Sequence, residues 1–181
     1  MLAGFGEADI TPNLRAKPVY MAGFGQNRKA TGVHDPLKAR AVVLAHGRRK
    51  IALVCVDLVG FFLPDVEKVR ARLSGFDYVM VSSTHNHEGP DTLGLWGPAP
   101  LVSGVDAEYM GFVRLQIVKA VRAADAARKP VTAHFGHHVL AVNKLISAWK
   151  MPSPNPAAHP TPIELRRPSR ATATPGTTNN V

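Results

Sequence analysis

Hydrophobic and polar positions alternate with the period of β-strands in the first part of the chain. Two β-rich runs, residues 39–45 (ARAVVLA) and 50–57 (KIALVCVD), are separated by a polar tetrapeptide, and this arrangement predicts a β-hairpin. Apolar residues are nearly continuous from Ile51 to Val56, which is typical of a strand buried on both faces. Residues 2–12 are predicted to form an extended entry segment that ends at a Thr-Pro pair.

The period then changes to that of an α-helix. Pro64 and Asp65 suit a first helical turn, and Ser74-Gly75 suits its end. The apolar residues between these signals share one helix face: Phe62, Val66, Val69 and Leu73. A buried strand is expected next, over residues 78–82 (YVMVS). A strand, a helix and a strand in this order predict a right-handed crossover between two parallel strands.

A second helix is expected from Asp106, which would cap it, to a point before Pro130. Its apolar face comprises Met110, Val113, Ile117, Ala120 and Ala124. A last strand-like run covers residues 131–142. These elements predict an α/β fold: a mixed β-sheet with a hairpin and a βαβ crossover, and helices packed on the sheet.

Charge and proline content divide the chain. The 181 residues include 22 Lys and Arg against 13 Asp and Glu, for a net charge of +9. Residues 144–181 contain seven prolines, five basic residues and one acid. We therefore expect a disordered basic tail over 144–181, behind a domain formed by residues 1–143. Such a tail can attract nucleic acid or anionic membrane, but this one lacks regular spacing and interleaved aromatics, so no specific nucleic-acid partner is expected.

The sequence also limits the class of protein. A single cysteine, Cys55, excludes an internal disulfide framework and a CxxC metal site. No apolar run approaches the roughly 20 residues of a membrane helix, so no transmembrane segment is expected. No cleaved signal is visible either, which favours a cytoplasmic location. The sequence leaves the oligomeric state open.

Polar residues gather directly after the predicted strand 78–82. His85 and His87 lie two positions apart in the segment from Ser82 to Asp91. Sites in sheets with parallel strands collect beyond the carboxyl ends of those strands, and Asp57 ends the neighbouring strand at the same edge. Imidazole nitrogens and carboxylate oxygens are ligands that zinc accepts. The pattern therefore points to a divalent metal site that includes His85.

Other interpretations stay open at this stage. Histidines in a polar loop also serve as hydrogen-bonding surface residues, and Asp and Asn are common in turns. His34, after a Gly-rich loop, either adds a polar group to the site or belongs to a plain turn. Trp96 either lines a substrate mouth or anchors its loop.

Five motifs, taken in their order along the chain, resemble the N-terminal catalytic region of the neutral/alkaline, non-lysosomal ceramidase family. The resemblance covers residues 2 to about 143. The motifs are Gly4-Phe5-Gly6-Glu7-Ala8-Asp9-Ile10-Thr11, Met21-Ala22-Gly23-Phe24-Gly25, Gly32-Val33-His34-Asp35 running into Arg40-Ala41, Val54-Cys55-Val56-Asp57-Leu58, and Ser83-Thr84-His85-Asn86-His87-Glu88-Gly89-Pro90.

The resemblance implies a zinc-dependent hydrolase that cleaves the amide of ceramide or a similar N-acyl amide. His85 matches a zinc-binding histidine of the family, and His87 matches a catalytic histidine close to the bound ligand. Gly4 and Gly6 match a loop whose backbone approaches the substrate. Asp57 and His34 are expected to support the site without binding the metal themselves.

The chain also departs from the family. The family has Ser-Gly-Pro-Gly-Gly where this sequence has Glu88 to Thr92, and carboxylates at the mouth of the site would favour a more polar substrate than a long-chain lipid. The family's other zinc ligands and its nucleophilic serine match nothing here, because the resemblance ends after Asn143. We therefore expect an incomplete ceramidase-like domain that binds zinc weakly and is inactive alone. The alternatives are a non-catalytic truncated product and a basic binding protein that acts through its tail.

Overall fold

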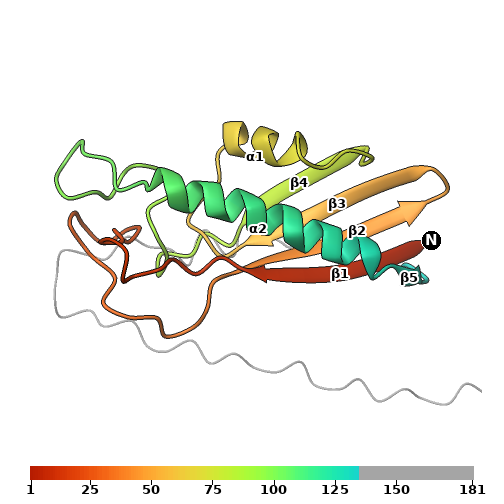
Figure 1. The fold of residues 1–181 in the computed structure, drawn as a ribbon, viewed down its shortest axis with the longest axis horizontal. Helices are drawn as coiled ribbons and strands as arrows, with labels where there is room; N and C mark the ends of the chain where they lie inside the picture. The colour runs from red at the N-terminus through yellow and green to blue at the C-terminus, as the bar shows by residue number, and fades with distance from the viewer. Residues whose placement is uncertain (135–181) are drawn as a thin grey trace, which may run out of the picture. The chain divides into compact units, whose positions relative to one another are not determined.

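The computed structural model describes residues 1–134, which form one α/β unit (Figure 1). A five-stranded sheet has the order β4-β3-β2-β1-β5, and two helices pack on it. The elements are β1 (Leu2–Asp9), β2 (Lys38–His46), β3 (Arg49–Val56), α1 (Leu63–Arg70), β4 (Tyr78–Ser83), α2 (Ala107–Ala126) and β5 (Lys129–Pro130). The mixed α/β sheet predicted from the sequence is confirmed.

The hairpin and the crossover both form as predicted. Strands β2 and β3 are antiparallel, and Gly47 in the turn between them has a positive φ of 57°. Strands β3 and β4 are parallel and are joined through α1. The entry segment is more regular than expected, since β1 pairs along its whole length with β2. Its residues therefore form an inner strand of the sheet.

Both helices cover the same face of the sheet. Helix α2 lies over β1 and β2, and α1 packs beside α2 and β4 (Figure 1). The side chain of Asp106 caps α2 by accepting hydrogen bonds from the backbone N–H groups of Glu108 and Tyr109. The predicted apolar face of this helix is buried: Met110, Val113, Ile117, Ala120 and Ala124. The cap and the helical period therefore located this element correctly.

The two faces of the sheet differ in their burial. In β2 and β3, alternate residues face the helices and are buried, whereas Ile51, Leu53 and Cys55 on the opposite face are only partly covered. The expectation that β3 is buried on both faces is thus wrong for the described residues. No element within residues 1–134 lies over the second face.

The described chain finishes at the far edge of the sheet. Strand β5 has two residues, which pair with Leu2 and Ala3. The strand predicted from Val131 does not form over residues 131–134, although the Val131 N–H donates to the Met1 carbonyl. Residues 135–142 of that run, the boundary after residue 143 and the predicted basic tail lie outside the described residues. Among the described helices, none combines the length and apolar character needed to cross a membrane.

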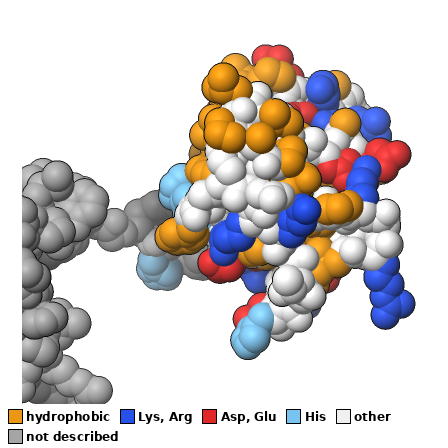
Figure 2. All heavy atoms as spheres, turned by 90° about the vertical axis from the view of Figure 1, so that its left-hand side faces the viewer, with side chains coloured by type: hydrophobic (Ala, Val, Ile, Leu, Met, Phe, Trp, Pro, Cys, Tyr) orange, Lys and Arg blue, Asp and Glu red, His pale blue; other side chains and the backbone are white. Residues whose placement is uncertain are grey.

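The loops gather at one end of the sheet. Strands β1, β3 and β4 all run toward this end, on the left of Figure 1, while the β2–β3 turn lies at the other. Viewed from this loop end, the surface shows hydrophobic side chains close to histidines (Figure 2). The residues predicted to carry chemistry follow β3 and β4 here.

Candidate functional site

His85 lies two residues beyond β4 in a conformation that few non-glycine residues adopt. Its φ is 61°, in the left-handed region. The residues on either side hold it there: Thr84 N–H donates to the Val56 carbonyl at 3.0 Å, and Asn86 N–H donates to the Leu58 carbonyl at 3.2 Å. The loop after β4 is thereby fixed to the loop after β3.

The ring of His85 is oriented by the backbone. Its Nδ1 lies 2.8 Å from the carbonyl oxygen of Val59. A carbonyl only accepts, so Nδ1 carries the hydrogen in this contact. In the neutral ring Nε2 then keeps its lone pair, the state in which imidazole binds a metal or accepts a proton.

His87 faces this lone pair. The two Nε2 atoms are 3.3 Å apart, and the two rings meet edge to face with centroids separated by 4.8 Å. The other nitrogen of His87, Nδ1, is buried and has no hydrogen-bond partner among residues 1–134. Because Nε2 of the neutral His85 ring keeps its lone pair, Nε2 of His87 carries the hydrogen in this contact, and the two rings form a hydrogen bond.

A glycine loop closes over His87. Gly23 has a φ of 80°, and a Cβ atom added to it would collide with Nδ1 of His87. The loop is held by Arg28, whose Nη2 donates to the carbonyl oxygens of His87, at 2.6 Å, and Ala22, at 3.1 Å. Only glycine therefore allows the backbone to approach the ring this closely.

Aromatic rings flank His87. Phe24 and Trp96 each meet the His87 ring nearly edge to face, with centroid distances of 5.7 and 5.8 Å. Phe24 is 80% exposed, while Trp96 is partly buried. The His87 ring thus lies between two aromatic side chains and is open on the Phe24 side, while His85 is exposed.

The described residues do not form a complete metal centre. Within residues 1–134 there is no group of three or more His, Cys, Asp or Glu side chains that could hold an ion. The histidine pair supplies two candidate donors, and a catalytic zinc site uses three protein ligands.

Solved structures of longer proteins contain the same fold. A ceramidase in complex with C2 matches with a TM-score of 0.59 and 30% sequence identity over 71% of this chain. The neutral ceramidase from Pseudomonas aeruginosa matches with a TM-score of 0.56 and 28% identity over the same share. The chain contains a ceramidase-family N-terminal region. It spans 22% of the length of either solved protein. No family model and no curated protein matches it.

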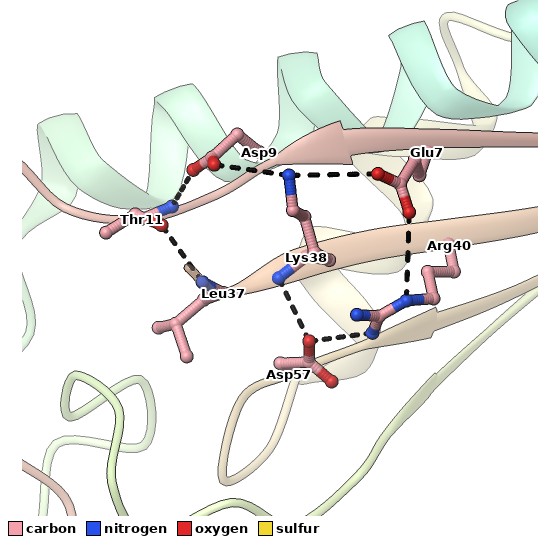
Figure 3. Close-up of polar contacts among 7 residues, drawn as sticks. All are labelled: Glu7, Asp9, Thr11, Leu37, Lys38, Arg40 and Asp57. Atoms are coloured by element: carbon pink, nitrogen blue, oxygen red, sulfur yellow. Dashed lines mark hydrogen bonds and ion pairs between the residues drawn. The ribbon is translucent and has the colours of Figure 1, made fainter. Parts of the chain in front are cut away.

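Asp57 takes part in a network at the start of β2 in this ceramidase-like domain (Figure 3). Its Oδ2 accepts hydrogen bonds from the Lys38 backbone N–H at 3.0 Å and from Arg40 Nη1 at 2.8 Å. Figure 3 shows the network continuing through Lys38 and Arg40 to Glu7 and Asp9 on β1. Asp57 therefore joins the end of β3 to β2, and Lys38 and Arg40 extend the network to β1. The role of Asp57 in support of the histidines stays a prediction.

Thr11 joins the same network. Hydrogen bonds from its side chain and backbone amide lower the pKa of Asp9, with a smaller contribution from Lys38. The Thr11 hydroxyl also accepts a hydrogen bond from the backbone N–H of Leu37 at 2.9 Å. The chain that enters β2 and the chain that leaves β1 are thus fixed together beside the site.

His34 lies on a separate part of the loop end. Its Nδ1 is 2.7 Å from Asp35 Oδ2, and this contact raises the pKa of His34. Both side chains are exposed, and both line a cavity of about 430 Å³ together with Thr11, Met21 and Glu88. Its contribution to the ceramidase-like site also stays a prediction.

Gly4 and Gly6 lie where β1 crosses under α2. A Cβ atom at Gly4 would collide with the carbonyl oxygen of Ala124, and one at Gly6 with that of Ala120. Close packing of strand and helix is thus one reason for glycine at these positions. The backbone approach to substrate that the ceramidase resemblance implies remains a prediction, and Gly6 is also reachable from the open face of the sheet.

Two features of the site could not be assigned from the sequence pattern. The first is the loop carrying Gly23 and Phe24, whose glycines were visible but whose contact with His87 was not. The second is Asp91, which was expected among the carboxylates at the mouth but is only 1% exposed. Of the two acids after His87, only Glu88 is exposed, and it faces Arg28 at 3.5 Å. Of the carboxylates that favoured a polar substrate, only Glu88 is therefore accessible to one.

Proposed function

We propose that this chain is the N-terminal part of a ceramidase-like, zinc-dependent amidohydrolase that cleaves an N-acyl amide such as ceramide. The observation that carries the proposal is the His85 ring, whose Nδ1–H is bound by the Val59 carbonyl so that Nε2 faces His87 with its lone pair. A metal-binding histidine characteristically donates its other ring N–H to a carbonyl or carboxylate in this way. The similarity to solved ceramidases supports the same assignment.

The histidine pair suits zinc in its chemistry. Imidazole nitrogen is a preferred zinc donor, and the two Nε2 atoms face each other at 3.3 Å. His85 would hold the ion, which when bound would supply Lewis acidity toward an amide carbonyl. His87 would stand beside the reacting group, where its Nε2 can hold a proton.

The residues around the pair have complementary tasks in this proposal. Val59 fixes the tautomer of His85, and Gly23 lets the backbone close over the buried edge of His87. Trp96, which is partly buried, would shield one side of the His87 ring from water. A less hydrated site strengthens the electrostatic interactions that amide cleavage requires.

The chain alone is expected to be inactive. His85, helped at best by His87, leaves zinc short of the three protein ligands that catalytic sites use, and no third donor joins them within residues 1–134. The solved ceramidases are several times longer than the part this chain matches. We therefore expect the remaining ligands and the nucleophile to come from polypeptide outside the described residues.

Zinc titration by calorimetry tests the proposal. The parent chain and His85→Ala would be titrated with zinc, with His34→Ala as the matched control because His34 is an exposed histidine of the same loop end. We expect weak binding in the parent and in His34→Ala and none of it in His85→Ala. Equal zinc binding in all three proteins would contradict the assignment of His85.

Hydrolysis assays separate the enzyme from the fragment. Ceramide and a short N-acyl amide would be offered to the parent chain with zinc present, and negligible turnover is expected with both. Turnover that is lost in His85→Ala would show that the chain assembles a complete site, and it would overturn the expected inactivity while keeping the role of His85.

A further inference from the structure

Asp91 is a buried carboxylate whose hydrogen bonds all come from backbone amides. Its Oδ1 accepts from the N–H groups of Leu93 at 3.0 Å, Gly94 at 2.8 Å and Leu95 at 3.4 Å. Its Oδ2 accepts from Trp96 at 3.0 Å and Gly104 at 3.1 Å. The side chain is 1% exposed, and within residues 1–134 it forms no ion pair with Lys or Arg. Five backbone N–H dipoles therefore stabilise the negative charge of Asp91 in place of a positively charged side chain.

These amides belong to the loop that carries Trp96. The loop turns tightly: Gly94 has a φ of 82°, and a Cβ atom at Gly97 would collide with the carbonyl of Val102. At Gly104 a Cβ atom would lie 2.9 Å from Oδ2 of Asp91 and 2.6 Å from the Trp96 carbonyl. Both ends of the loop thus close on the same carboxylate.

The loop is also joined to the segment that carries Phe24. Asp91 N–H donates to the Tyr20 carbonyl at 2.7 Å, and Asn27 N–H donates to the Gly97 carbonyl at 2.7 Å. The side chain of Gln26 donates to the Leu95 carbonyl at 2.8 Å. The segments that carry Phe24 and Trp96 are therefore joined by hydrogen bonds, and Asp91 contacts both of them.

We propose that Asp91 is a positioning residue that holds Trp96 against His87 and so fixes one wall of the site. Asp91 acts through the backbone of the loop, since its oxygens reach the Trp96 amide and not the indole. The relevance of this wall to amide cleavage rests on the proposed function. The positioning itself does not, because its test needs neither zinc nor substrate.

Asp91→Asn is the informative substitution because it changes one oxygen only. The amide oxygen can still accept from Leu93, Gly94 and Leu95, but the new NH₂ group faces the N–H groups of Trp96 and Gly104. Two buried donors then lack an acceptor, and leaving buried donors unsatisfied is costly. The substitution therefore removes the hydrogen bonds to Trp96 and Gly104 and keeps those to Leu93, Gly94 and Leu95.

Native-state hydrogen exchange gives the first readout. We expect the amides of Trp96 and Gly104 to exchange at least about fivefold faster in Asp91→Asn than in the parent, relative to the core amide of Val113. Local opening raises the exchange rate of these amides alone, whereas a general loss of stability raises the rate of all amides that exchange through global unfolding. Val118→Ala, a core truncation, serves as the control for general destabilisation.

Fluorescence of Trp96 gives the second readout. The other tryptophan, Trp149, lies outside the described residues and would be replaced by phenylalanine in every protein compared. We expect Asp91→Asn to lower the anisotropy of Trp96 and to increase its quenching by acrylamide. Asp106→Asn should leave both unchanged, because Asp106 also accepts backbone amides but caps α2 instead.

The outcomes distinguish this proposal from the proposed function. If the folded Asp91→Asn protein keeps the amide protection and the anisotropy of the parent, Asp91 does not position Trp96, whatever the zinc titration shows. If Val118→Ala loosens Trp96 as much as Asp91→Asn does, the effect is general stability and the proposal is wrong. If zinc binding fails while Asp91→Asn frees Trp96, the positioning stands without the amidohydrolase.

Discussion

The two faces of the sheet differ in the size of their side chains and in how far those side chains are buried. The face under the helices is built from small residues, and Ala39, Ala41, Val43, Ala52 and Val54 are each at most 2% exposed. The other face carries larger apolar side chains that remain partly or largely exposed, including Phe5 at 70% and Met80 at 41%. Small residues let a helix approach the sheet closely, whereas large residues on the open face leave a groove of about 650 Å³.

Within the described residues, the covered face contributes more to the stability of the fold than the open face does. Side chains on the covered face have lost their contact with water, so each contributes its full transfer free energy. Side chains on the open face have lost only part of it. Substitutions on the two faces should therefore differ in a predictable order.

The largest effect is expected on the covered face. Ile117 is completely buried in α2. Ile117→Ala should lower the free energy of unfolding by about 2–5 kcal/mol, because it removes buried methyl groups and leaves a cavity. Denaturant titration measures the loss. A change below about 1 kcal/mol, which is usual for tolerant sites, would show that the helix does not seal this face.

The next effect concerns the seam between β1 and α2. Gly6→Ala forces a methyl group against the backbone of Ala120 and should lower the free energy of unfolding by about 1–3 kcal/mol through overpacking. Gly32→Ala is the matched control, because a Cβ atom there meets nothing within 4 Å. Comparable stability of the two variants would contradict the close packing described for this seam.

Tyr109 gives the covered face a dependence on alkaline pH. Its hydroxyl donates to the Ile10 carbonyl at 2.8 Å, and burial, followed by the nearby charge of Asp9, raises the pKa of Tyr109 well above its ordinary value of 10.0. Above pH 10 the unfolded chain releases this proton and the folded chain keeps it, so stability present below pH 10 is lost as the pH rises. We expect a loss of about 1 kcal/mol between pH 10 and pH 11.

Tyr109→Phe is the control for this alkaline loss. It removes the ionisable group, so the slope of unfolding free energy against pH above 10 should be shallower than in the parent. The same slope in both proteins would assign the alkaline loss to other groups, such as lysines.

The smallest effect is expected on the open face, where two adjacent residues of β3 make the comparison direct. Leu53 faces the open side and is partly exposed, while its neighbour Val54 faces the helices and is 2% exposed. Leu53→Ala should cost less than about 1 kcal/mol, and Val54→Ala more, although the leucine loses more atoms. A larger loss for Leu53→Ala would show that the open face is packed in solution.

Local sequence signals predicted most of the fold, because the residues that determine each of these elements lie within or next to it. The hairpin, the parallel pair β3–β4 and the capped helix α2 all followed from period, turn and cap. The predicted burial of β3 on both faces was wrong. A continuous apolar run shows that a strand can be buried on both faces, but it does not show whether another element covers each face. The extended entry segment became an inner strand for a similar reason: its two glycines lowered its strand signal, and the helix that requires them lies more than a hundred residues away.

The candidate site was predictable only in part. The position of His85 and His87 beyond β4 followed from the rule for parallel strands and from the ceramidase motifs. The contact of Gly23 with His87 and the burial of Asp91 depend on how loops fold back, which residue type alone does not determine. An aspartate next to a Gly-Pro pair looks like an exposed turn residue until the amides that surround it are known.

The glycine seam between β1 and α2 has a consequence for the order of events on the ribosome. The strand emerges first, yet the helix whose backbone it touches is complete only at Ala126. At roughly 5–20 residues per second, β1 and β2 can pair several seconds before that helix exists. During this interval the newly formed strands expose the face that α2 later covers as well as the open face. A chaperone would then have the largest apolar surface to bind.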